Sequence, residues 1–197
     1  EDRTKADFLY NKIGFDKKTS MPWGKELANM ALNICHDVIV DSERGRELAQ
    51  HGSALFPIAC YAEDLSSYSV AWHWHEEFEY VLCMKGPLHV DVNKTRLTLQ
   101  TGQGVFINSG VLHAVEQASE GTALLHSGVF HPRLTGGMDT IFWQKLIRPL
   151  LQPGAPAFFL LDEAVPWQKQ VLVFLRDAWK AVSYTHLRAH ETAANIV

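Results

Sequence analysis

Residues 73–86 read HWHEEFEYVLCMKG, and this stretch decides both the fold and the candidate site. Side chains alternate along a strand, so His73 and His75 project to the same face. Glu79 keeps the same parity, and a strand with a short turn can return its carboxylate to that face. His113, from a separate run, can complete a set of three nitrogens and one oxygen. Such a set suits iron, manganese, zinc or nickel.

The spacing in this stretch resembles the first motif of the cupin family: two histidines one residue apart, three residues, a glutamate, six residues and a glycine. His73, His75, Glu79 and Gly86 match all of these positions. A glycine that usually precedes the motif is Ser67 here. The resemblance covers roughly residues 54–131 and implies a cupin jelly-roll barrel.

A second cupin motif is present with departures. Gly102, Gly110 and His113 stand at the expected places, while Asn108 replaces the usual proline and Gln117 the closing asparagine. Asn108 restores a backbone donor and adds an amide near His113. We expect it either to form an Asx-turn or to contact an effector.

Period-two patterning between turns supports the same fold class. Eight β-rich runs are separated by Gly, Pro, Asn, Asp and Ser, which indicates a mainly β sandwich or jelly roll. The predicted strands are 55–61, 68–75, 77–84, 88–92, 96–99, 105–107, 113–116 and 123–130. We therefore place the cupin barrel at residues 54–137.

Helical patterning flanks the barrel at both ends. Residues 1–53 are predicted as a helical extension, with an amphipathic helix over about 22–40 and a short helix over 41–50. Residues 138–182 are predicted as a helical dimerisation segment. Its helices cover 139–150, where Pro149 ends or kinks the helix, and about 166–182. The expected apolar surface of these helices includes Trp143, Trp167 and Trp179.

This order of elements is similar to the N-terminal sensor half of AraC/XylS-type bacterial transcription regulators. The stretches 55–61, 106–113 and 130–133 carry that resemblance. It implies a barrel that binds a small effector, such as a sugar, and helices that form a homodimer. DNA would be bound only through a C-terminal pair of helix-turn-helix motifs, which this sequence lacks, so the chain is expected to be truncated before that half.

The last segment, 183–197, is predicted not to be native. It begins SYTHLRAHET, is polar, and resembles a tail found on many unrelated predicted proteins. The metal-like spacing of His186 and His190 is therefore set aside.

Composition narrows the classes of partner that we expect this chain to bind. The net charge is −4, and residues 51–137 hold four lysines or arginines against eight acids, so this barrel offers no basic patch for DNA. The three cysteines, Cys35, Cys60 and Cys83, form no CxxC pair and read as free, reduced thiols. With no signal peptide and no apolar run of membrane length, the expected location is cytoplasmic, without membrane contact.

Three roles remain open for the four ligand-type residues: they bind a divalent metal, they hydrogen-bond an effector directly, or they pair with one another for structural reasons. Glu76 and Glu77 are expected at the rim. By parity Trp72 and Trp74 face away from the histidines, where they either pack or offer a sugar-stacking surface.

Two classes of function follow. The first, which we favour, is a non-enzymatic, effector-sensing and dimerising domain of an AraC-like regulator. The alternative is a small metal-dependent cupin enzyme of the dioxygenase, isomerase or decarboxylase type. That alternative needs a separate acid or base, and the sequence shows none beyond the glutamates.

Overall fold

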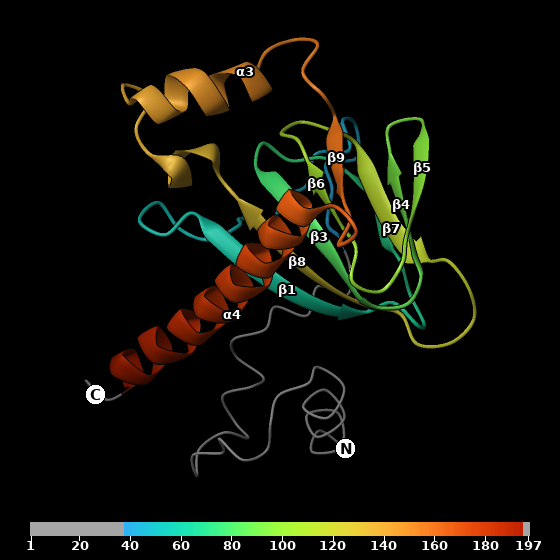
Figure 1. Ribbon diagram of the computed structural model, residues 1–197. Coiled ribbons are helices and arrows are strands. Elements are labelled where there is room, and N and C mark those ends of the chain that lie inside the picture. The colour runs from blue at the N-terminus through green and yellow to red at the C-terminus, as the bar shows by residue number, and fades with distance from the viewer. Residues whose placement is uncertain (1–37, 195–197) are drawn as a thin grey trace.

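Two facing antiparallel sheets form the body of the protein in a computed structural model that describes residues 38–194 (Figure 1). One sheet has five strands in the order β1-β8-β3-β6-β9, and the other has four in the order β2-β7-β4-β5. Apolar side chains from both sheets meet between them. The architecture is the predicted mainly β jelly roll.

All eight predicted strands are present, with ends shifted by a few residues at most. A ninth strand follows the Pro/Gly-rich stretch 152–156 and pairs with β6 at the edge of the larger sheet. The strands are β1 (Ile58–Asp64), β2 (Val70–His73), β3 (Phe78–Lys85), β4 (Leu88–Val92), β5 (Thr95–Leu99), β6 (Gly104–Ile107), β7 (His113–Gln117), β8 (Leu124–Phe130) and β9 (Phe158–Leu161).

Strand β3 is buried on both faces. Val81 and Cys83 pack inside the barrel, whereas Tyr80 and Leu82 pack on the outer face against helix α4 (Pro166–Ala194). Figure 1 shows α4 lying across the five-stranded sheet. The near-continuous apolar run of β3 arises because a helix covers the side that would otherwise meet water.

The C-terminal helices lie close to their predicted positions. A short 3-10 helix, η2 (Pro132–Thr135), leaves the barrel, and a π-helical turn, η3 (Trp143–Ile147), runs into α3 (Arg148–Leu150). The helix that contains Pro149 ends at Leu150, as expected.

Helix α4, however, does not end near Val182, because it continues to Ala194. The first residue past the predicted end, Ser183, is buried, and within the described residues its hydroxyl is the only buried side-chain polar atom without a hydrogen-bond partner. A buried unpaired hydroxyl costs free energy. That misfit is compatible with a non-native segment from Ser183 onward, which stays a prediction.

Two tryptophans expected on an exposed face are instead part of the monomer core. Trp179 is only 1% exposed, donates from Nε1 to the carbonyl of Tyr61 and stacks on His126. Trp143 packs against Phe78 and Ile147. Both side chains cover the outer face of the five-stranded sheet, so this part of the interface prediction is wrong.

The predicted short helix over 41–50 is also wrong, because this segment forms a tight hairpin. The Asp41 carboxylate accepts hydrogen bonds from the backbone N–H groups of Glu43 and Arg44, and Gly45 adopts a φ of +67°. Val40 then pairs with Glu47. An Asx-turn followed by a left-handed glycine reverses the chain at the position where we predicted a helix. The predicted helix over 22–40 lies almost wholly outside the described residues.

Cys60 and Cys83 are buried and in no disulfide, and burial raises the pKa of the two thiols to about 12 and about 11. Cys35 lies outside the described residues. Within residues 38–194, no helix combines the length and the apolar character needed to cross a membrane.

The contact between His126 and Trp179 predicts an acid-sensitive fold. Burial, aided by nearby Lys180, lowers the pKa of His126 from 6.5 to about 4. As pH falls from 6.5 towards 4, the unfolded chain takes up this proton and the folded chain does not, so stability is lost in that window. Replacing His126 with Phe should remove about 2–3 kcal/mol of the wild-type loss between pH 7 and pH 4.5.

Urea unfolding at the two pH values measures this difference. His89→Gln, on the smaller sheet, is the matched control and should keep the wild-type loss. An equal loss in wild type and His126→Phe would contradict the assignment.

Candidate metal and effector site

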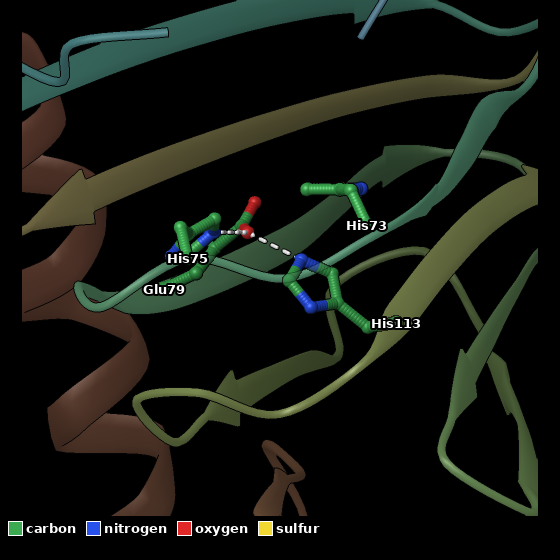
Figure 2. Close-up of side chains that lie close together, drawn as sticks. All are labelled: His73, His75, Glu79 and His113. Atoms are coloured by element: carbon green, nitrogen blue, oxygen red, sulfur yellow. Dashed lines mark hydrogen bonds and ion pairs between the residues drawn. The ribbon is translucent and has the colours of Figure 1, made fainter. Parts of the chain in front are cut away.

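His73, His75, Glu79 and His113 converge inside the barrel, as predicted. One ligand atom from each lies within 4.8 Å of the others, and all four residues are buried. The Glu79 carboxylate stands at the centre: its Oε2 is 3.2 Å from His75 Nε2 and 3.0 Å from His113 Nε2. Figure 2 shows this carboxylate between the two rings, with His73 beside them.

Strand register brings these residues together from three elements. His73 ends β2 directly opposite His113, the first residue of β7. Glu79 lies on β3 in the facing sheet. His75 lies just beyond β2, and its carbonyl accepts a hydrogen bond from Gly110, whose φ of +70° lets the second-motif loop turn back onto the first.

Each of the three imidazoles is anchored through Nδ1. The Nδ1 atoms of His73 and His113 lie 2.8 Å from the carbonyl oxygens of Ala71 and Val111, and that of His75 lies 3.2 Å from the carbonyl of Glu77. A carbonyl only accepts, so each Nδ1 must donate. Nε2 is therefore the atom that each ring directs at the cluster, which is the orientation that metal-binding histidines usually have, and it would have to be unprotonated to bind a metal.

The cluster holds a buried negative charge. Burial alone would raise the pKa of Glu79, but hydrogen bonds from His113 and His75 outweigh it and hold that pKa well below its usual value. Burial would likewise lower the pKa of His113, yet the Glu79 carboxylate raises it. Burial and the neighbouring His113 lower the pKa of His73 to about 4. Neutral His73 therefore keeps a lone pair on Nε2 at neutral pH.

A small cavity of about 30 Å³ lies against these side chains. Its apolar wall is formed mainly by valines, and its polar wall includes Glu47, His51, Tyr61, Glu63, His73, Glu79 and His113. One water needs roughly 10–15 Å³ of such space. The cavity therefore suits an ion with its waters or a ligand of few atoms.

Glu47 and His51 were missed as site residues by the sequence analysis. The hairpin that carries Glu47 lies along the HxH loop: Glu47 N–H donates to the carbonyl of Trp74, and Trp74 N–H donates to that of Gly45. The Glu47 carboxylate thereby lies 3.9 Å from His73 Nε2 and 2.9 Å from His51 Nε2. The only signal in the sequence was a glutamate and a histidine four residues apart, a spacing common on ordinary helices.

Tyr61 and Glu63, both on β1, complete the polar wall. Tyr61 Oη lies 2.7 Å from His51 Nδ1. Burial and the nearby Glu79 raise the pKa of Glu63 to about 8, and the Tyr68 hydroxyl donates to its carboxyl group. They stand two residues apart on β1 and therefore face the same side of the strand; neither was predicted as a site residue.

Asn108 does not join the cluster. Its amide nitrogen donates to the carbonyls of Leu150 and Pro156, and its Oδ1 accepts from the backbone N–H of Ser109. The side chain thus fixes the loop that leads to β9 and is not among those that line the cavity. The contact with Ser109 is local, close to the Asx-type role that we predicted as one alternative.

The residues around the HxH motif lie largely as expected. Glu76 is exposed and pairs with Arg46, while Glu77 is half-buried beside His75. Trp72 is exposed, and Trp74 donates from Nε1 to the carbonyl of Arg44 under the guanidinium of Arg46. Neither tryptophan lines the cavity.

The comparisons agree with this geometry. Residues 66–128 match the family model described as Cupin domain. Residues 66–128 therefore have the fold expected of a cupin domain. It is also 36% identical over 147 residues to an uncharacterized HTH-type transcriptional regulator, YdeC, of Bacillus subtilis (strain 168). That match covers 70% of this chain and 46% of the relative, so the chain spans about half of the relative's length.

Two solved structures are also similar. One is the Cnp3 cupin domain of Schizosaccharomyces pombe, with 11% identity and a TM-score of 0.38, covering 45% of this chain and 66% of that chain. The other is a predicted oxalate decarboxylase of Thermotoga maritima, with 21% identity and a TM-score of 0.34, covering 38% and 64%. Nothing about the function of this chain follows from likenesses at this level.

The donor set fits a divalent transition metal, because three imidazole nitrogens and one carboxylate surround a single point and the rings are already oriented. His73, His75, Glu79 and His113 could therefore hold such an ion.

Replacing His73 with Ala should weaken Mn(II) binding by about two orders of magnitude or more, since losing even an indirect partner of a metal ligand costs 10–100-fold. We choose His73 for this test because, unlike His75 and His113, its ring has no hydrogen bond to Glu79. Its replacement should therefore destabilise the fold less. Competition with a fluorescent chelator measures the dissociation constant.

His89→Ala, a histidine of β4 outside the cluster, serves as the control and should bind like wild type. Equal Mn(II) affinity in wild type and His73→Ala would remove His73 from the ligand set.

Proposed function

We propose that this chain is the effector-sensing, dimerising cupin domain of a transcription regulator of the AraC type. The observation that carries the proposal is the small cavity beside four buried ligand-type residues, in a chain similar to an HTH-type regulator. The acidic barrel offers no surface for DNA. DNA contact would belong to a helix-turn-helix half like that named in the relative.

The effector would bind in the cavity next to His73 and Glu79. A bound metal ion would supply a Lewis acid for an oxygen-bearing ligand, with Glu47 and His51 on the wall of the same cavity. For a ligand as large as a sugar, the hairpin over residues 40–47 would move outward. Movement of this hairpin would change the surface outside the barrel when the effector binds in the cavity.

Dimerisation would use the apolar surface of the C-terminal elements. Trp167 and Phe174 are 60% and 67% exposed and lie seven residues apart, on one face of α4. Phe159 and Leu160 on the edge strand β9, and Ile141 and Phe142 before η3, are also exposed. Exposed apolar surface of this extent usually marks an interface, and a two-fold contact would bury it on both copies.

The double substitution Trp167→Glu and Phe174→Glu should convert a dimer into a monomer, because it would bury charges in an apolar contact. Light scattering coupled to size exclusion at tens of micromolar measures the mass. Leu55→Glu is the control, since Leu55 is 97% exposed and lies outside the C-terminal helices. A wild-type monomer, or a dimer that survives the double substitution, would contradict this interface.

A metal-dependent enzyme is the second candidate. One observation favours it: the buried Glu47–His51 pair supplies the separate acid or base that the sequence did not reveal. An enzyme would convert its ligand, whereas a sensor would release it unchanged. Chromatography of each ligand after incubation with the protein separates the two functions.

A thermal-shift screen of small hydroxyl- and carboxyl-bearing compounds tests sensing directly. At a ligand concentration 100 times its dissociation constant, binding adds about 2.7 kcal/mol, or roughly 5–10 °C for a domain of this size. We expect such shifts with Mn(II) present, with the compound recovered intact. Shifts of equal size in His73→Ala would place the binding elsewhere, and conversion of the compound would favour the enzyme.

A further inference from the structure

A second group of metal-type ligands lies beside the cupin set. Ligand atoms of Glu47, His51 and His75 lie within 4.8 Å of one another, and all three residues are buried. Glu47 and His51 precede the barrel in the sequence, while His75 belongs to the HxH motif. The two groups therefore overlap at one imidazole, and together they hold four histidines and two glutamates.

His51 is oriented like the histidines of the cupin set. Its Nδ1 lies 2.7 Å from Tyr61 Oη, and its Nε2 lies 2.9 Å from the Glu47 carboxylate. The hydroxyl of Tyr61 thus takes the place that backbone carbonyls take for His73 and His113. An imidazole anchored at Nδ1 presents Nε2 as the ligand atom.

The position of Glu47 is fixed independently of any ligand. Its backbone N–H donates to the carbonyl of Trp74, and Arg46 pairs both with the Trp74 backbone and with the Glu76 carboxylate. These bonds attach the hairpin to the HxH loop itself. A change in position of the loop would therefore carry Glu47 with it.

We infer that the barrel holds two cations, the second bound by Glu47, His51 and His75. His75 belongs to both groups, and its Nε2 can serve only one ion. With both ions bound, His75 would therefore leave the first group for the second, and the six residues divide into two sets of two histidines and one carboxylate. The first set is His73, Glu79 and His113, and the second is His51, His75 and Glu47. Two histidines and one carboxylate per ion is a ligand set that leaves positions open for water or a ligand.

The number of ligand residues is what favours two ions over one. Glu47 and Glu79 offset part of the charge of two divalent cations, and the carboxyl group of Glu63 lies on the same cavity wall. Metal pairs in proteins are typically about 3.5–4 Å apart. Glu47 Oε2 of the second set lies 3.9 Å from His73 Nε2 of the first, so the two sets are adjacent. An oxygen-bearing effector could then span both ions, which deepens the proposed function and rests on it.

Bound Mn(II) per chain after equilibrium dialysis tests the inference, with elemental analysis for the count and electron paramagnetic resonance for coupling between ions. We expect two ions per wild-type chain, with spin coupling. His51→Ala and Glu47→Gln should each bind one ion without coupling, and His73→Ala should retain the ion of the second set. Saturation of the wild type at one ion, or two coupled ions in His51→Ala, would overturn the inference.

Tyr61→Phe provides a variant that keeps the core volume. Loss of the hydroxyl that anchors His51 should weaken only the second ion, by about 10–100-fold, and leave the first unchanged. Equal effects on both ions, or on neither, would count against separate sets. A single-ion wild type that still binds a small-molecule effector would reject this inference while leaving the sensing proposal intact.

Discussion

A carboxylate buried between two imidazoles is the constraint on which the rest of the site depends. Glu79 is charged and inside the barrel, and such a charge is tolerated only when it is paired and hydrogen-bonded. The pairing requires β3 to face the start of β7 and the turn after β2. The same contacts orient the imidazoles towards one point. A strand shift of one residue would turn Glu79 out of the barrel, so the site and the register are specified together.

The segment before the barrel supplies part of the cavity wall. Without the hairpin around Gly45, the cavity wall would lack Glu47, and His51 would lose its carboxylate partner. The hairpin is held mostly by backbone bonds to Trp74 and by the exposed Arg46–Glu76 pair. Exposed ion pairs contribute little stability. The hairpin is thus attached to the HxH motif, but it is held less strongly than the strands of the sheets beneath it. Such an attachment suits an element that responds to ligand binding.

The sequence predicted the barrel well because its signals are local. Alternation, turn residues and two spaced motifs gave eight strands and the convergence of His73, His75, Glu79 and His113. The predictions from sequence were wrong where tertiary contacts decide the position of a side chain. The apolar face of the helix with Trp179 was predicted to form an interface between chains. In the structure, Trp179 packs instead on the outer face of the five-stranded sheet of the same chain. Glu47 and His51 carry no motif, and only the Asx-turn at Asp41 brings them to the cavity. The role of Asn108 depended on a loop more than forty residues away, at Leu150 and Pro156.

The central claim is that this buried cluster is a cation site. Crystals of the chain grown with Mn(II) and measured on both sides of the manganese absorption edge test it most directly. The account predicts an anomalous difference peak enclosed by His73, Glu79 and His113, at about 2.0–2.3 Å from the ligand atoms. Density for ordered side chains in this cluster, without any anomalous peak at saturating Mn(II), would contradict it.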